Sequence, residues 1–118
     1  MSSMPQPQGD PQSSRPRVGV LEDEQAMRSL LARILSPEFD TWFAHSGATL
    51  SAAVSEGAID VILLDILLPG EDGIAIAKAI RARSPIPMIL LSGLSSAETI
   101  ITGLTVGVDV YVTKLIHT

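Results

Sequence analysis

Three segments of this chain are almost continuously apolar, and helix-like segments lie between them. The three runs are residues 17–22, 59–65 and 87–93. Strands that are apolar throughout, without alternation, are typical of parallel sheets whose two faces are both buried. Parallel neighbours also need a crossover connection, which is usually a helix. The pattern therefore predicts an α/β fold in which helices cover both faces of a parallel sheet.

The boundaries of the elements follow from periodicity and from local stop signals. Apolar residues recur at helical spacing after residue 24 until Pro37 ends the pattern. Asp72 is expected to cap another helix, and Ser95 with Glu98 has the spacing of a capping box. Strands are predicted at 17–22, 41–45, 59–65, 87–93 and 108–114, and helices at 24–35, 47–57, 73–83 and 95–107.

The composition is that of one globular domain with a polar tail. The chain has 118 residues, of which 46% are hydrophobic, and it has no cysteine, which excludes a disulfide framework and a zinc–thiolate site. The net charge of -5 argues against nucleic acid or an anionic membrane as a direct partner. Residues 1–16 contain four prolines and no large apolar anchor, so we interpret them as a disordered tail and place the folded domain at 17–118. The tail has no signal-peptide core and the longest apolar run is ten residues, so we expect a cytoplasmic protein without a membrane span.

Polar side chains occupy the ends of the predicted strands. Glu22 and Asp23 end the first strand, Asp65 the third, Ser92 the fourth and Lys114 the last. In an open parallel α/β sheet, ligands bind beyond the carboxyl ends of the strands. We therefore expect three carboxylates, a hydroxyl and an ammonium group to converge at one edge of the sheet. Asp65 follows an unbroken apolar stretch. Its predicted position at the edge of the sheet, and not in the middle of the buried strand, explains how its charge is tolerated.

Such a cluster of carboxylates requires a cation. Two carboxylates about 5 Å apart repel by roughly 3 kcal/mol at an effective dielectric near 20. An all-oxygen site suits Mg²⁺ or Mn²⁺, whereas the histidine and cysteine ligands that zinc and copper prefer are absent from the group. A carboxylate beside such an ion, with a lysine and a hydroxyl opposite, is equipped to receive a phosphoryl group on Asp65.

Four segments together resemble the signature motifs of the receiver domain of bacterial two-component response regulators. They are VGVLEDE, DVILLDILLPGEDG, PMILLSG and GVDVYVTK, and the resemblance covers about Arg17 to Lys114. It implies a flavodoxin-like doubly wound parallel sheet with the strand order 2-1-3-4-5. It also implies phosphorelay signalling, in which the domain accepts a phosphoryl group from a histidine kinase or phosphotransfer protein and acts on an output partner that the sequence does not name.

The resemblance implies a metal site around the phosphoacceptor. Asp65 is the expected phosphoacceptor, and Asp23 and Asp65 would bind Mg²⁺ (or Mn²⁺) directly. Glu22 would bind it through water, and the backbone carbonyl of Leu67 would be a further metal ligand. The implied chemistry is confined to the domain's own aspartate, as self-phosphorylation and autodephosphorylation, so we expect a signalling protein and not an enzyme.

The resemblance also implies a switch. Ser92 and Lys114 would hold the phosphoryl group. Tyr111 resembles the aromatic residue that swings inward when the hydroxyl of Ser92 is drawn to the phosphate, in a two-state equilibrium.

The chain departs from the family pattern in three ways. Leu115 follows the lysine where the family usually has a proline, so the cis peptide that helps to aim Lys114 is not expected. The chain ends at Thr118, where the fifth helix of the family should begin, so we expect that helix to be missing and the uncovered sheet face to support a homodimer or an exchange of a strand or helix. Leu67 and Leu94 flank the phosphate position and cannot orient an attacking water, so we expect a slowly hydrolysed aspartyl phosphate.

Two other functions stay open on the sequence alone. A pseudo-receiver would use the same fold as a phosphorylation-independent protein-interaction module. An aspartate-nucleophile phosphatase is less favoured, because such enzymes carry a second acidic residue two positions after the nucleophile, where this chain has Leu67.

Overall fold

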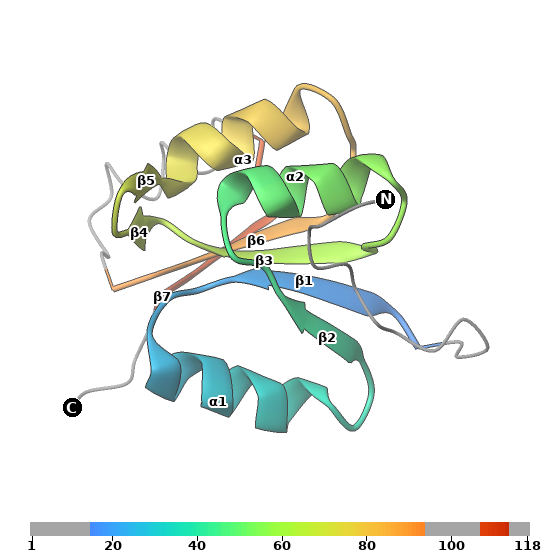
Figure 1. Cartoon of the computed structure of the whole chain (residues 1–118), viewed down its shortest axis with the longest axis vertical. Coiled ribbons are helices and arrows are strands. Elements are labelled where there is room, and N and C mark those ends of the chain that lie inside the picture. Colours follow the sequence, from blue (N-terminus) through green and yellow to red (C-terminus); the bar gives the residue numbers. More distant parts are fainter. Residues whose placement is uncertain (1–14, 94–106, 114–118) are drawn as a thin grey trace.

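A parallel sheet lies between two layers of helices (Figure 1). The computed structural model describes residues 15–93 and 107–113, with Tyr111 and Thr113 described by their backbone only. Its elements are β1 (Arg17–Leu21), α1 (Gln25–Leu35), β2 (Asp40–Phe43), α2 (Gly47–Ser55), β3 (Val61–Asp65), β4 (Leu67–Leu68), β5 (Glu71–Asp72), α3 (Gly73–Arg81), β6 (Met88–Ser92) and β7 (Val110–Thr113). Helix α1 covers one face of the sheet, and α2 and α3 lie together on the other face (Figure 1).

The main sheet has five parallel strands in the order β2-β1-β3-β6-β7. Numbered along the chain within this sheet, the order is 2-1-3-4-5, so the predicted flavodoxin-like topology is confirmed. Leu21 at the end of β1 lies opposite Leu64 of β3, and Asp65 lies opposite Leu91 of β6. This register brings the carboxyl ends of the three central strands to nearly the same level at one edge of the sheet.

The larger core lies between the sheet and the two helices α2 and α3. Side chains along β3 alternate between the faces, so Ile62 and Leu64 point toward this layer while Leu63 points toward α1. Leu50 of α2 and Ile80 of α3 are also fully buried here. Each such aliphatic side chain contributes about 1.5–3 kcal/mol when it is removed from water. These contacts fix both helices against the sheet.

A smaller core lies on the opposite face, under α1. Its buried side chains are Val18, Val20, Leu63 and Leu91. Strand β7 pairs in register with β6, so Val110 and Val112 point to this same face, where they are 47% and 41% exposed. The prediction that an uncovered part of the sheet supports a homodimer or an exchange of elements stays a prediction.

An additional two-stranded sheet, which the sequence analysis did not predict, follows β3 directly. Strands β4 and β5 pair antiparallel, with Leu67 opposite Asp72 and Leu68 opposite Glu71. Gly70, in the turn between them, has a φ of 73°, a conformation that glycine adopts without steric cost. This β4–β5 hairpin therefore lies at the edge of the main sheet where the strand ends meet.

Contacts at the start of the described chain begin with two residues that the sequence analysis assigned to the tail. Arg15 forms an ion pair with Asp40, with 2.6 Å between Nη2 and Oδ1, and the carbonyl oxygen of Pro16 accepts a hydrogen bond from the Asp40 N–H. The rest of the predicted tail, the predicted helix from Ser95 to residue 106, and residues 114–118 lie outside the described residues. Across residues 15–93 and 107–113, none of the helices has the length and apolar character needed to cross a membrane.

Candidate functional site

Three carboxylates meet at the carboxyl edge of the main sheet. Glu22 and Asp23 directly follow β1, and Asp65 is the last residue of β3. Leu21 of β1 lies opposite Leu64 of β3. The residues that follow them, Glu22 and Asp65, therefore lie at the same level along the two neighbouring strands. One carboxylate oxygen from each of the three acidic residues lies within 4.8 Å of the other two. The structure thus brings together the three acidic residues that the sequence analysis selected.

Burial and backbone hydrogen bonds restrict how these carboxylates can point. Glu22 and Asp65 are each 3% exposed, whereas Asp23 lies at the surface. The Glu24 N–H donates to Oε2 of Glu22 at 3.0 Å, and the Leu67 N–H donates to Oδ1 of Asp65 at 3.2 Å. Each of these bonds orients a carboxylate from the loop that follows its own strand. The cluster therefore has an inner pair of acidic groups and one outer group facing solvent.

The donor set of this cluster fits a hard divalent cation. At a separation of 4.8 Å, two like unit charges repel by about 3.5 kcal/mol at an effective dielectric near 20. A cation between the carboxylates removes that repulsion. All three donors are carboxylate oxygens, which are the ligands of Mg²⁺, Mn²⁺ and Ca²⁺ and not of metals that select imidazole or thiolate. Glu22, Asp23 and Asp65 are the residues that would hold the ion.

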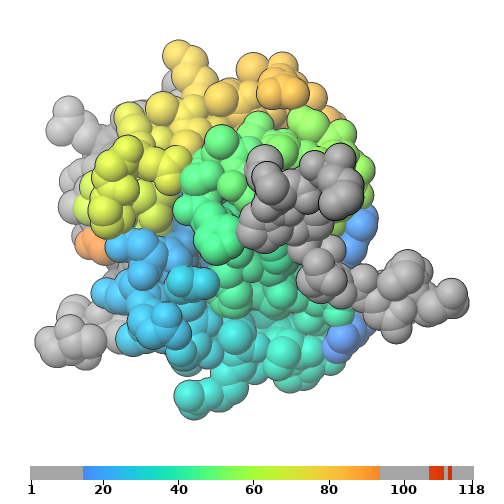
Figure 2. All heavy atoms as spheres, viewed as in Figure 1, coloured from blue at the N-terminus to red at the C-terminus, as the bar shows by residue number. Residues whose placement is uncertain are grey.

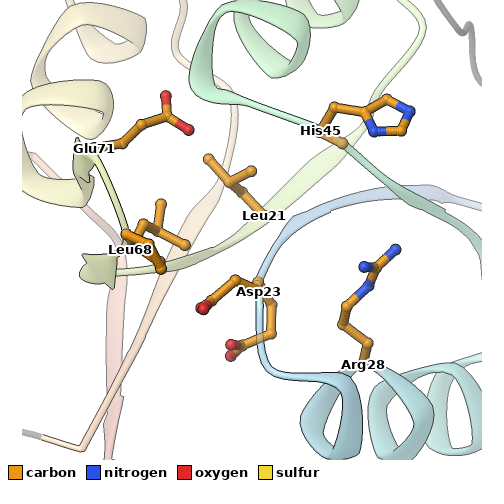
Figure 3. A pocket seen from close by; sticks show the side chains of 9 residues that line it. Leu21, Asp23, Arg28, His45, Leu68 and Glu71 are labelled. Carbon is orange, nitrogen blue, oxygen red and sulfur yellow. The ribbon is translucent and has the colours of Figure 1, made fainter.

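A pocket with a volume of about 250 Å³ opens beside the carboxylates (Figure 3). Its lining includes Glu22 and Asp23 on one side and the β4–β5 hairpin on the other, together with Arg28 and His45. The guanidinium carbon of Arg28 lies 5.1 Å from the centre of the Phe43 ring, which is the geometry of a cation–π contact. Figure 2 shows the start of α1, in light blue, next to the yellow-green hairpin at this edge of the molecule.

The pocket includes residues that sequence reasoning missed. No functional role was predicted for Arg28, His45 or Glu71. Arg28 occupies an ordinary position in the first turns of an amphipathic helix, so nothing local distinguishes it from a solvated charge. Glu71 lies inside the motif that carries Asp65, and in the sequence it resembles an ordinary turn residue. Its hydrogen bond with Gly47 of α2, which is distant in the sequence, is visible only in the structure.

Close packing holds the hairpin and α3 against β3. The Gly73 N–H donates to the carbonyl oxygen of Ile66 at 3.0 Å. A Cβ atom at Gly73 would contact the Asp65 carbonyl oxygen and would lie 2.6 Å from the Ile66 Cα atom. Helix α3 can therefore begin here only because residue 73 has no side chain, and this close approach sets the path of the chain after Asp65.

The other residues selected from the sequence lie in or near this edge or outside the described residues. Ser92 is fully buried at the end of β6, opposite Thr113. Tyr111 is part of β7, but its side chain lies outside the description, as do Lys114 and Leu94. The side chain of Leu67 is 58% exposed, and its N–H contacts Asp65.

The comparison with protein families agrees with this geometry. Residues 18–118 match the model of the response regulator receiver domain. The chain belongs to the response regulator receiver domain family. Its acidic edge is therefore the edge of a receiver domain, and the predicted family is confirmed.

Individual relatives support the same assignment for this receiver domain. It is 35% identical over 101 residues to the DNA-binding response regulator MtrA of Mycolicibacterium smegmatis, an alignment that covers 85% of this chain and 44% of that protein. The chain thus spans less than half the length of the curated relatives that it matches. The receiver domain of the Francisella response regulator 1452 superimposes with a TM-score of 0.78 at 31% identity, covering 87% of each chain.

A more distant structure is similar in fold. It is a Burkholderia pseudomallei response regulator with a phosphorylated aspartic acid, a calcium ion and citrate. The TM-score is 0.76 at 20% identity, and the alignment covers 86% of this chain and 61% of that one.

Proposed function

We propose that this receiver domain is a phosphorylation-dependent signalling module that accepts a phosphoryl group on Asp65 from a histidine kinase or phosphotransfer protein in the presence of Mg²⁺. The observation that carries the proposal is the convergence of Glu22, Asp23 and Asp65 within 4.8 Å at the carboxyl edge of the sheet. Such a cluster is an unfavourable arrangement for a purely structural protein, because the charges repel and two of the three side chains are buried.

Asp65 is the proposed nucleophile. A carboxylate oxygen of Asp65 attacks phosphorus, the bond between phosphorus and the imidazole nitrogen of the donor breaks, and that nitrogen retains the bonding electrons and takes up a proton. The Leu67 N–H orients Oδ1 of the attacking carboxylate. When bound, the divalent ion supplies positive charge that offsets the charge on the transferred phosphoryl oxygens. The carboxylates of Glu22, Asp23 and Asp65 and the carbonyl of Leu67 are its proposed ligands.

The response to phosphorylation is proposed to depend on the ends of the last two strands. Ser92 is fully buried one residue beyond the strand position that faces Asp65, which suits a hydroxyl that donates to a phosphoryl oxygen. Lys114 follows β7 and is proposed to neutralise the same group. Tyr111 on β7 is proposed to change its position with Ser92, so that phosphorylation shifts a two-state equilibrium.

The proposal also covers the type of activity, the cellular location and the output, and it bases them on family membership. The domain modifies only its own aspartate, so it acts as a signalling protein, and we place the phosphotransfer in the cytoplasm. The output is proposed to be made by a partner protein or an effector segment. The relative MtrA is described as DNA-binding, and this chain aligns with 44% of that protein.

The proposal is tested by phosphorylation with a small acyl phosphate and Mg²⁺, followed by intact-mass measurement. The wild-type chain is expected to gain the mass of one phosphoryl group, and the Asp65→Asn variant is expected to gain none. Asp60→Asn is the matched control, because Asp60 precedes the same strand at its opposite end and is exposed. It should be phosphorylated like the wild type. Chelation of the metal by EDTA should prevent the reaction in both.

The same experiment separates the proposed function from the alternative. A pseudo-receiver would show no added mass with acyl phosphate and no change in thermal stability with beryllofluoride and Mg²⁺. Addition of a phosphoryl group to Asp65→Asn would show that another residue accepts it, which would contradict the proposed role of Asp65.

A further inference from the structure

Glu71 connects the β4–β5 hairpin to a helix that is distant in the sequence. Its Oε1 atom accepts a hydrogen bond of 2.9 Å from the N–H of Gly47, the first residue of α2. Figure 3 shows the Glu71 side chain extending from the hairpin, with its carboxylate pointing away from Asp23. The carboxylate lies at the positive end of the α2 dipole, where a negative charge is stabilising. One side chain therefore links the segment after the phosphoacceptor to the beginning of α2.

This contact ties the hairpin to α2, in addition to the packing of Leu68 against the larger core and the capping of α3 by Asp72. Its strands are only two residues each, and they pair with each other and not with the main sheet. Two hydrogen bonds hold its ends: the Leu67 N–H donates to the side-chain Oδ1 of Asp65, and the Gly73 N–H donates to the carbonyl oxygen of Ile66. The Glu71 side chain supplies the attachment to α2, from a position opposite Leu68 in the hairpin.

The site at Gly47 is shaped for this contact. A Cβ atom at Gly47 would lie 2.6 Å from Cδ1 of Ile76 and 3.0 Å from Oε1 of Glu71. Glycine at this position therefore allows both α3 and the Glu71 carboxylate to approach the helix. The N-cap of α2 does not involve the hairpin. It is Ser46, whose hydroxyl oxygen accepts a 3.1 Å hydrogen bond from the Thr49 N–H in the first turn of the helix.

We propose that Glu71 is a positioning residue for the metal site: by linking the hairpin to α2, it fixes the backbone of Leu67 and so sets the affinity for Mg²⁺. This inference rests on the proposed function, because it assigns to Glu71 a role in the same metal site. Glu71 does not itself need to touch the ion. Residues that orient metal ligands from outside the coordination shell typically change metal affinity by roughly 10- to 100-fold when they are removed.

The test is the dissociation constant for Mg²⁺, measured by calorimetry on the wild type and on three variants. Glu71→Ala removes the hydrogen-bond acceptor and is expected to weaken Mg²⁺ binding by roughly tenfold. Glu71→Gln keeps an acceptor oxygen and is expected to stay within about twofold of the wild type, which separates positioning from a simple loss of charge. Ser46→Ala removes the other side-chain acceptor at the start of α2 without touching the hairpin. It should lower the thermal midpoint and leave the Mg²⁺ affinity within about twofold.

Hydrogen exchange without metal gives a second measurement. The amides of residues 67–72 are expected to exchange faster in Glu71→Ala than in the wild type, and at the wild-type rate in Ser46→Ala. If Glu71→Ala does not fold, Glu71→Leu keeps the side-chain bulk without the acceptor, and the same two changes are expected of it.

The outcomes that overturn the inference are distinct from those that overturn the proposed function. Wild-type affinity in Glu71→Ala, or an equal loss of affinity in Glu71→Gln or Ser46→Ala, contradicts the role of Glu71 while the metal site stands. A wild-type protein that does not bind Mg²⁺ overturns the proposed metal site and this inference with it.

Discussion

The substitution Gly73→Ala tests how closely the hairpin and α3 are packed against β3, the strand that ends in Asp65. The added Cβ atom would lie 2.6 Å from Cα of Ile66, compared with 3.4 Å for the shortest ordinary contact, and it would also meet the carbonyl oxygen of Asp65. The overlap is therefore about 0.8 Å, and the atoms it meets are backbone atoms that cannot rotate away. Either α3 or the chain after Asp65 has to move.

Both stability and chemistry should respond to that movement. Inserting a methyl group into a well-packed region typically costs about 1–3 kcal/mol. A displacement approaching 1 Å at a reacting group can reduce a rate by roughly 100-fold. We therefore expect Gly73→Ala to lower the free energy of unfolding in urea by about 1–3 kcal/mol and to slow acyl-phosphate phosphorylation of Asp65 by roughly 10- to 100-fold.

A matched glycine gives the control for this experiment. Gly93 follows β6 at the same edge of the sheet, and among the described residues a Cβ atom there would meet nothing within 4 Å. Gly93→Ala is therefore expected to leave the unfolding free energy within about 0.5 kcal/mol of the wild type. The packing argument is refuted if Gly73→Ala unfolds at the same urea concentration as Gly93→Ala and is phosphorylated at the wild-type rate.

Two further predictions concern surface residues. The side-chain hydrogen bond from Arg17, supported by the Arg17 backbone N–H, holds the pKa of Asp60 below its ordinary value. A carboxyl whose pKa is lowered by folding stabilises the protein above its unfolded pKa of about 3.9 and loses that contribution as the pH falls through the folded value. Because Arg17 and Asp60 are both exposed, Asp60→Asn should lower the free energy of unfolding by only about 0.5–1 kcal/mol at neutral pH. The difference in unfolding free energy between this variant and the wild type should shrink in acid. A difference that stays the same between pH 7 and pH 2 would contradict this reasoning. Leu67→Asn should shorten the lifetime of the aspartyl phosphate by roughly tenfold, because an amide at this 58% exposed position can orient an attacking water and the leucine side chain cannot. Intact-mass measurements during phosphate loss, with Leu67→Met as the control, would show equal lifetimes for all three proteins if this reasoning is wrong.

Interactions between residues close in the sequence were predictable without the structure. The unbroken apolar stretch before Asp65 predicted a buried strand, and β3 is buried along most of its length. Asp72 was predicted to cap a helix, and its Oδ1 accepts hydrogen bonds from the N–H groups of Ile74 and Ala75. These predictions succeeded because helix caps and continuous burial leave a signal within a few residues of their cause.

The β4–β5 hairpin shows where a local signal was too weak. Each of its strands has two residues, which is too short for an alternating pattern to appear in the sequence. The Pro69-Gly70 pair marks a turn, but a turn after a buried strand does not by itself predict pairing across it.

The sequence by itself determined the type of elements, their order along the chain and the acidic residues that end the first and third strands of the main sheet, because periodicity and composition act over short distances. It also carried the motifs by which the receiver family was identified. Tertiary structure decided the contacts between segments far apart in the chain. The register of β1 against β3 places Glu22 beside Asp65. Gly47 and Glu71, which are 24 residues apart in the sequence, are joined by a hydrogen bond. Such contacts depend on how whole elements pack against one another, and no short stretch of sequence encodes that packing.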